Sequence, residues 1–171
     1  SSYSSDSHKH DLKPQCSKPI PINHVPVTIT TPGKYCVTKN LIYRGSGDAI
    51  TIAASNVTLN FENHDLVLTD PAATGVFAGD VTEITILNDK INLITLPALD
   101  TSAAIHFEGV TKGKIDNVYT SNTFFGVRIE GSSDIIVSNS HHKDHISDSS
   151  SSLLPTAVLA LDSSAVAIDS I

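Results

Sequence analysis

Two short segments alternate apolar residues with ionisable ones, and these ionisable residues are the first candidates for chemistry. Ile105-His106-Phe107-Glu108 and Val127-Arg128-Ile129-Glu130 both follow this pattern. In a β-strand, such alternation turns the apolar side chains to one face and the ionisable ones to the other. An arginine near carboxylates could neutralise a uronate or support proton abstraction, and two carboxylates could serve as acid and base. The alternative, which we favour, is an exposed ion-pair ladder that contributes little energy.

A second group of candidate ligands lies in a serine-rich segment and consists of His141, His142, Asp144 and His145. Three imidazoles and a carboxylate within five residues could bind a metal ion. The segment shows no pattern of a helix or hairpin that would orient these donors. We therefore favour a flexible polar loop with adventitious affinity, and we expect no metal or other cofactor.

The element that must position the first group is a repeat that begins at residue 49. The first inward residue of each unit is Ile50, Val76, Ile105, Val127 or Val158. In the last four units a second strand ends ten positions later, at Ile86, Ile115, Val137 or Ile168, whereas the first unit has one extra residue and ends at Phe61. Because one unit cannot bury its own inner face, we expect the copies to stack with their strands paired in parallel.

Stacking aligns the outward residues of the first strand of each unit. One row is predicted to contain Thr51, Phe77, His106, Arg128 and Leu159, and the next contains Ala53, Gly79, Glu108, Glu130 and Leu161. The four ionisable residues should therefore lie together on two adjacent coils.

A polar residue follows the second strand of each unit, at Asn63, Asn88, Asn117, Asn139 and Ser170. Asparagine tolerates the left-handed backbone of a sharp bend, and stacked amides can bond between coils. We predict that the four asparagines form the inner ladder of a corner; the alternative is that asparagine simply favours turns. The segments after this corner vary in length and are expected to project as loops, at residues 64–74, 89–103, 118–125 and 140–156.

Composition excludes several other classes of protein. The chain has 171 residues, of which 40% are hydrophobic, 5% aromatic and 17% charged, and its net charge is −7. The negative charge argues against a nucleic-acid partner, and no apolar run is long enough for a membrane span. Segments with the helical spacing of a bundle are missing. The composition suits strands and polar turns.

The N-terminal part differs from the repeat. Residues 1–28 are polar and contain Pro14, Pro19, Pro21 and Pro26, so we expect an irregular arm and cap there and a single repeat domain over residues 29–171. The two cysteines, Cys16 and Cys36, could form a disulfide or remain as reduced thiols, and the sequence leaves both readings open.

The stretch Ile29-Thr30-Thr31-Pro32-Gly33-Lys34-Tyr35 and the first coil from Ala49 to Phe61 resemble the right-handed parallel β-helix family of pectate lyases, polygalacturonases and phage tailspikes. The resemblance covers roughly residues 27–171. It implies an all-β, right-handed parallel β-helix solenoid of about five to six coils with an irregular N-terminal cap. In the pectin-degrading members the active groove runs along the outside of the first sheet. The resemblance therefore makes His106, Glu108, Arg128 and Glu130 the catalytic candidates of an enzyme, with calcium as a cofactor only of a lyase.

The chain also departs from those enzymes. It has no Asp-Asp pair and no His-Gly dipeptide, and its only arginines are Arg44 and Arg128. We therefore expect a structural or binding module at an exposed surface, extracellular or virion-associated, without catalysis and with a glycan or protein partner. The alternative is a polysaccharide lyase or glycoside hydrolase that acts on an acidic glycan along the first sheet.

The last repeat reaches its corner at Ser170, where an apolar cross-section and unpaired backbone groups would be exposed. Three elements could cover this coil: the remainder of a longer parent chain, a second copy in a homo-oligomer, or residues 146–156. We favour the first two.

Overall fold

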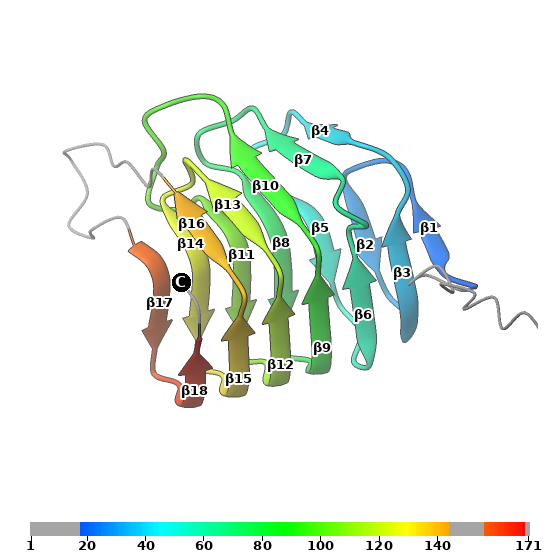
Figure 1. The fold of residues 1–171 in the computed structure, drawn as a ribbon, viewed down its shortest axis with the longest axis vertical. Helices are drawn as coiled ribbons and strands as arrows, with labels where there is room; N and C mark the ends of the chain where they lie inside the picture. The colour runs from blue at the N-terminus through cyan, green and yellow to red at the C-terminus, as the bar shows by residue number, and fades with distance from the viewer. Residues whose placement is uncertain (1–17, 144–155, 170–171) are drawn as a thin grey trace, which may run out of the picture.

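The computed structural model describes residues 18–143 and 156–169, and all regular structure in these residues is β-strand. The strands form three parallel sheets that stack coil on coil (Figure 1). The seven-stranded sheet contains, in order, β1 (Ile20–Ile22), β3 (Gly33–Val37), β6 (Val57–Asn60), β9 (Thr82–Leu87), β12 (Thr111–Asp116), β15 (Ser133–Ser138) and β18 (Ser164–Ile168).

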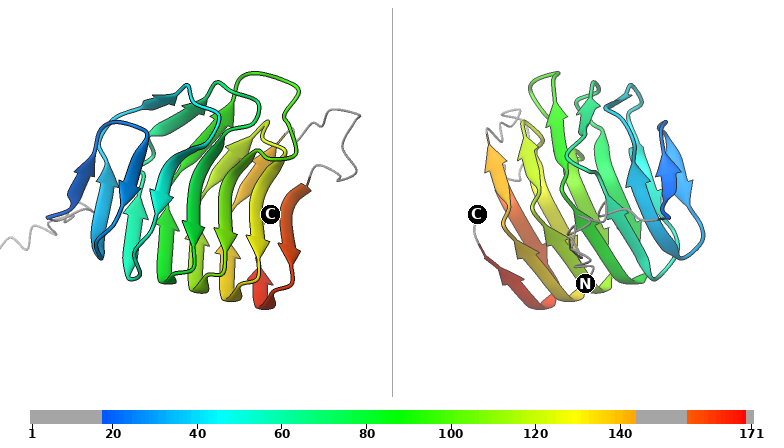
Figure 2. Two further views of the ribbon diagram at one scale, coloured as in Figure 1. Left: turned by 180° about the vertical axis from the view of Figure 1, so that it is seen from behind. Right: turned by 45° about the vertical axis from the view of Figure 1, so that its right-hand side comes forward.

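The other two sheets complete each coil. The six-stranded sheet contains β17 (Thr156–Leu161), β14 (Phe125–Glu130), β11 (Ala103–Glu108), β8 (Thr74–Gly79), β5 (Asp48–Ile52) and β2 (Val27–Ile29). The five-stranded sheet contains β16 (His141–Lys143), β13 (Tyr119–Ser121), β10 (Lys90–Leu93), β7 (Asp65–Leu68) and β4 (Leu41–Tyr43). The described chain passes through the sheets in turn from β2–β3–β4 to β14–β15–β16, so the fold is a parallel β-solenoid of about five turns (Figure 2).

The pairing register confirms the predicted stacking of the inward residues. Ile50, Val76, Ile105, Val127 and Val158 are successive partners in the six-stranded sheet. Ile86, Ile115, Val137 and Ile168 are successive partners in the seven-stranded sheet. The prediction was wrong for the first unit, because Leu59 rather than Phe61 pairs with Ile86. Apart from Ile168, the stacked apolar side chains belong to or pack against one continuous core. Full burial of such a side chain contributes about 1.5–3 kcal/mol.

The small residue at the start of each unit has a steric cause. A Cβ atom added at Gly75 would lie 2.5 Å from the backbone oxygen of Ala104, and one at Gly126 would lie 2.5 Å from that of Ala157. At these two positions the neighbouring coil thus approaches so closely that even the Cβ atom of alanine would force a shift of the backbone.

Two segments predicted as irregular contain strands. Residues 20–22 of the expected cap form β1, which pairs with β3 at the edge of the seven-stranded sheet. Pro21 is compatible with this place because an edge strand does not need every amide proton for pairing. The segments after the corner likewise begin with the third strand of each coil, β7, β10, β13 or β16, before any loop projects.

The asparagine corner is present but lies on the outside of the bend. Asn63, Asn88, Asn117 and Asn139 all have positive φ angles, between 48° and 59°. Their side chains are exposed or half-buried, so the predicted inner ladder is wrong. In three of the coils the next residue is buried instead, and these residues are Asp89, Val118 and Ser140.

The amide ladder also differs at both ends from the predicted one. Asn88 Nδ2 donates to Asn60 Oδ1 (3.1 Å), and Asn117 Nδ2 donates to Asn88 Oδ1 (2.7 Å). Asn60 takes the place predicted for Asn63 because the first coil has two more residues between β6 and β7 than later coils have at this corner. Asn139 Nδ2 donates to Asp116 Oδ1 (2.9 Å) rather than to Asn117.

The last described coil is less buried than the others. Ile168 is 41% exposed, whereas its stacking partner Val137 is fully buried. Figure 1 shows β17 and β18 at one end of the stack, with described strands on one side only. No helix in the described residues has the length and hydropathy needed to cross a membrane.

Candidate functional site

The six-stranded sheet brings together the four ionisable residues that the sequence singled out. His106 pairs with Arg128, and Glu108 pairs with Glu130, on the adjacent strands β11 and β14. Phe77 and Leu159 occupy the same outward row as His106 and Arg128, as predicted. The strands that carry this row are hydrogen-bonded to strands on both sides, so the backbone from which these side chains project is held in place.

Glu130 is the centre of the hydrogen bonds in this cluster. Arg128 donates to Glu130 Oε1 from Nη2 (2.6 Å) and from Nε (2.9 Å). His106 Nε2 lies 3.0 Å from the other oxygen, Oε2. Partial burial raises the pKa of Glu130, but hydrogen bonds and charges of Arg128 and His106 outweigh it, so the net pKa is below the ordinary value. Glu130 is therefore a carboxylate that accepts hydrogen bonds through both oxygens.

Aromatic rings support the two basic side chains. The ring of Phe77 meets the imidazole of His106 edge to face, with centroids 5.2 Å apart. The guanidinium carbon of Arg128 lies 5.1 Å from the centre of the Phe125 ring, and Nη1 donates to the Asp100 carbonyl (3.5 Å). Contacts of this kind restrict the rotamers of His106 and Arg128.

A shallow depression of about 290 Å³ opens beside this cluster. His106, Arg128 and Phe77 line one part of it, and the rest is lined by Ser46, Gly47, Asp48, Ala72, Thr74 and Thr101. Its walls therefore combine an aromatic ring with hydroxyl, imidazole, guanidinium and carboxyl groups.

Asp48 is the ionisable residue lining this depression that the sequence pattern missed. Asp48 is the first residue of β5 and does not belong to the outward row. Its place at the beginning of the strand puts it among the residues that line the depression. Partial burial raises the pKa of Asp48, and the charge of nearby His106 offsets only part of this effect. Only its position directly before Ala49, where the first repeat unit begins, could have indicated it.

The second group of candidate ligands is spread over two environments. His141 and His142 lie on β16, so this part of the segment is a strand and not the predicted loop. His142 Nδ1 lies 2.6 Å from the hydroxyl oxygen of Thr120, whereas His141 is exposed. Asp144 and His145 lie outside the described residues.

The cysteine alternatives are resolved for one residue. Cys36 is buried on β3 and is disulfide-bonded. The sequence contains one other cysteine, Cys16, which lies outside the described residues.

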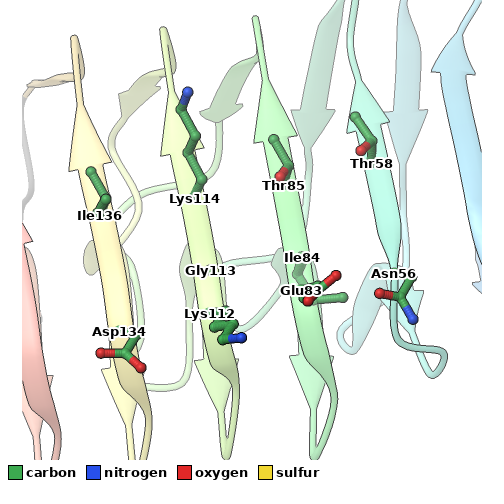
Figure 3. A pocket seen from close by; sticks show the side chains of 10 residues that line it. All are labelled: Asn56, Thr58, Glu83, Ile84, Thr85, Lys112, Gly113, Lys114, Asp134 and Ile136. Atoms are coloured by element: carbon green, nitrogen blue, oxygen red, sulfur yellow. The ribbon is translucent and has the colours of Figure 1, made fainter.

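A larger depression of about 580 Å³ lies on the outer face of the seven-stranded sheet (Figure 3). Glu83, Lys112 and Asp134 follow one another across β9, β12 and β15, and all three have positive φ angles. No ion pair joins these residues to one another in the part of the chain that the structure describes. This face carries charges in register, but its side chains do not form a hydrogen-bonded cluster.

A further ionisable group is buried at the corner between the seven-stranded and five-stranded sheets. Asp89 is 2% exposed, and neither carboxyl oxygen has a hydrogen-bond partner among the described residues. Burial raises the pKa of Asp89 well above its ordinary value. The backbone amide of Tyr119 lowers this pKa by less than burial raises it. The same amide donates to the backbone carbonyl of Asp89 (3.0 Å).

Comparison of the chain with protein families, with curated proteins and with solved structures finds no match. The site must therefore be interpreted from its own geometry and chemistry.

Proposed function

We propose that the chain is a non-catalytic binding module whose six-stranded sheet holds a glycan along its outer face. The observation that carries the proposal is the depression in which Phe77, His106 and Arg128 stand beside Thr74 and Thr101. Glycan sites need an apolar ring for the faces of sugars and fixed polar groups for their hydroxyls. The stacked strands supply both groups on a scaffold that needs no rearrangement.

Charge favours a neutral glycan over an acidic one. Asp48, Glu108 and Glu130 contribute three carboxylates around the cluster, and Arg128 contributes one guanidinium. Arg128 is already hydrogen-bonded to Glu130. A uronate would therefore meet more negative than positive charge, whereas neutral hydroxyls can both donate to the carboxylates and accept from the side chains.

The wider setting of this proposal is a right-handed β-helix of the pectate lyase-like or tailspike-like kind, at an extracellular or virion surface. The resemblance of the first coils supports the family, and the disulfide at Cys36 supports an oxidising environment. The low proportion of charged residues is compatible with a structural surface protein.

Binding to a panel of neutral and acidic polysaccharides tests the proposal, with calorimetry in the presence of a chelator. We expect saturable binding of a neutral glycan and about a two- to tenfold loss of affinity in Phe77→Ala, since a lost aromatic contact contributes about 0.5–1.5 kcal/mol. Lys112→Ala, which alters only the depression on the seven-stranded sheet, is the control and should bind normally. Absence of binding, or binding that Phe77→Ala leaves unchanged, would refute the assignment.

The alternative function is a polysaccharide lyase or glycoside hydrolase. It is favoured by one observation, that carboxylates, an imidazole and a guanidinium meet on a single exposed face. New reducing ends, or unsaturated ends that absorb in the ultraviolet, would reveal cleavage of the glycan. Cleavage that disappears in Arg128→Ala and persists in Lys112→Ala would replace the binding module by an enzyme.

A further inference from the structure

Three donor atoms of metal-ligating type converge on the outer face of the six-stranded sheet. They belong to His106, Glu108 and Glu130, and all three atoms lie within 4.8 Å of one another. The residues come from two adjacent strands in fixed register, because Glu108 pairs with Glu130 and His106 pairs with Arg128. The imidazole and both carboxylates thus belong to the most regular part of the fold.

The surroundings hold two of these ligands in a fixed orientation. Both donors of Arg128 converge on Glu130 Oε1, which leaves Oε2 directed at His106 Nε2. Phe77 restrains the imidazole from its edge. Metal sites depend on such supporting contacts, because they set the orientation and basicity of the ligands. Glu108 is exposed, so it can close on an ion from outside without repacking.

The local charge suits a divalent cation. With Asp48 nearby, three carboxylates face one guanidinium, and the imidazole adds no charge in its neutral form. Bound at this place, a divalent ion would neutralise the remaining negative charge. It would also take the place of the proton between His106 Nε2 and Glu130 Oε2, and the neutral imidazole would then carry its proton on Nδ1.

We infer that His106, Glu108 and Glu130 form a binding site for a divalent transition metal of the zinc class. One imidazole nitrogen and two carboxylate oxygens supply three ligands, and water completes the coordination. Imidazole suits zinc, cobalt, nickel and copper, whereas calcium takes six to eight oxygen ligands. The inference goes beyond glycan binding and does not depend on it.

Calorimetric titration of the full chain with ZnCl₂, without glycan, tests the site, and CoCl₂ adds a visible spectrum that reports the ligand geometry. We expect about one equivalent to bind, with affinity at least about tenfold lower in His106→Ala, Glu108→Gln and Glu130→Gln. Glu83→Gln and His141→Ala are matched controls, since these residues lie on other sheets. Both should bind as the wild type does.

Two further measurements show whether a loss of metal binding in a variant reflects a lost ligand or a lost fold. Circular dichroism shows whether each variant is folded, and Glu108→Gln, at an exposed position, should not disturb the fold. Thr101→Ala separates the two proposals, because Thr101 lines the depression and contacts none of the three metal ligands, so the variant should weaken glycan binding and retain the metal. No saturable binding of either ion to the wild type, or binding that is lost in His141→Ala and kept in His106→Ala, would overturn the inference.

Discussion

Glu130 and Asp89 are both carboxyl groups positioned by the stacking of coils, yet their environments are opposite. Glu130 stands on the outer face of the six-stranded sheet and accepts hydrogen bonds from Arg128 and His106. Asp89 lies at an inward corner position, and its stacking neighbours on the next two coils are Val118 and Ser140. Neither carboxyl oxygen of Asp89 has a partner among the described residues.

The pKa shifts follow from this difference. The pKa of Glu130 is lowered because its partners outweigh partial burial, whereas the pKa of Asp89 is raised because burial is not compensated. A solenoid repeats its backbone environment at every coil but not its side-chain partners. The energetic cost of an ionisable residue at a repeated position therefore depends on whether the side chains of the neighbouring coils can hydrogen-bond to it.

The largest effect is expected when a second carboxyl group is placed in the inward corner. Val118→Asp introduces a carboxyl beside Asp89 at a position that is 1% exposed. An uncompensated buried charge costs about 3–5 kcal/mol, so the free energy of unfolding should fall by about that amount. Urea denaturation measures it, and a decrease below about 1 kcal/mol would show that the corner accommodates charge.

Removing the carboxyl group of Asp89, which has no partner among the described residues, should increase the stability of the protein. Asp89→Val copies the residue of the next coil and should raise the free energy of unfolding by about 1–3 kcal/mol at neutral pH, since it removes an unsatisfied buried group. Below pH 3.8, the ordinary pKa of this carboxyl group, Asp89 is protonated in both the folded and the unfolded protein. Above that pH the unfolded protein loses the proton first, because the pKa of Asp89 is raised in the folded protein. The stabilisation should therefore be greatest at neutral pH and shrink towards pH 3.

Thermal unfolding of Asp89→Val and wild type across this pH range measures the difference. Asp65→Asn, at an exposed position on β7, is the control and should change stability by less than about 0.5 kcal/mol at every pH. A stabilisation by Asp89→Val that does not depend on pH would mean that folding does not raise the pKa of Asp89.

The smallest effect is expected at the partnered carboxylate. Glu130→Gln, measured with a chelator present, should lower the free energy of unfolding by less than about 1 kcal/mol, because partly exposed ion pairs contribute little. The same urea assay allows direct comparison with Val118→Asp. A loss above about 2 kcal/mol would make the cluster a structural element of the solenoid and remove the contrast with Asp89.

The outward row illustrates what a repeat allows one to predict. Once the small residue and the alternating strand of each unit are aligned, parallel pairing leaves a single register, and His106 must stand beside Arg128. The backbone of the corner was also predictable in part, since asparagine readily adopts a left-handed bend. The sequence did not predict which residue of the corner points inward, because a bend lacks the period-two alternation that indicates the inward residues of a strand.

The sequence by itself determined the solenoid, the register of the coils after the first and the grouping of His106, Glu108, Arg128 and Glu130, because these depend on local alternation and on the spacing between units. Only the tertiary structure decided that Asp48 reaches the same depression, that Arg128 and His106 divide the two oxygens of Glu130, and that Asp89 is left without a partner. The physical reason is that side-chain partners depend on contacts between coils and on where strands begin and bend, and neither leaves a periodic trace in the chain.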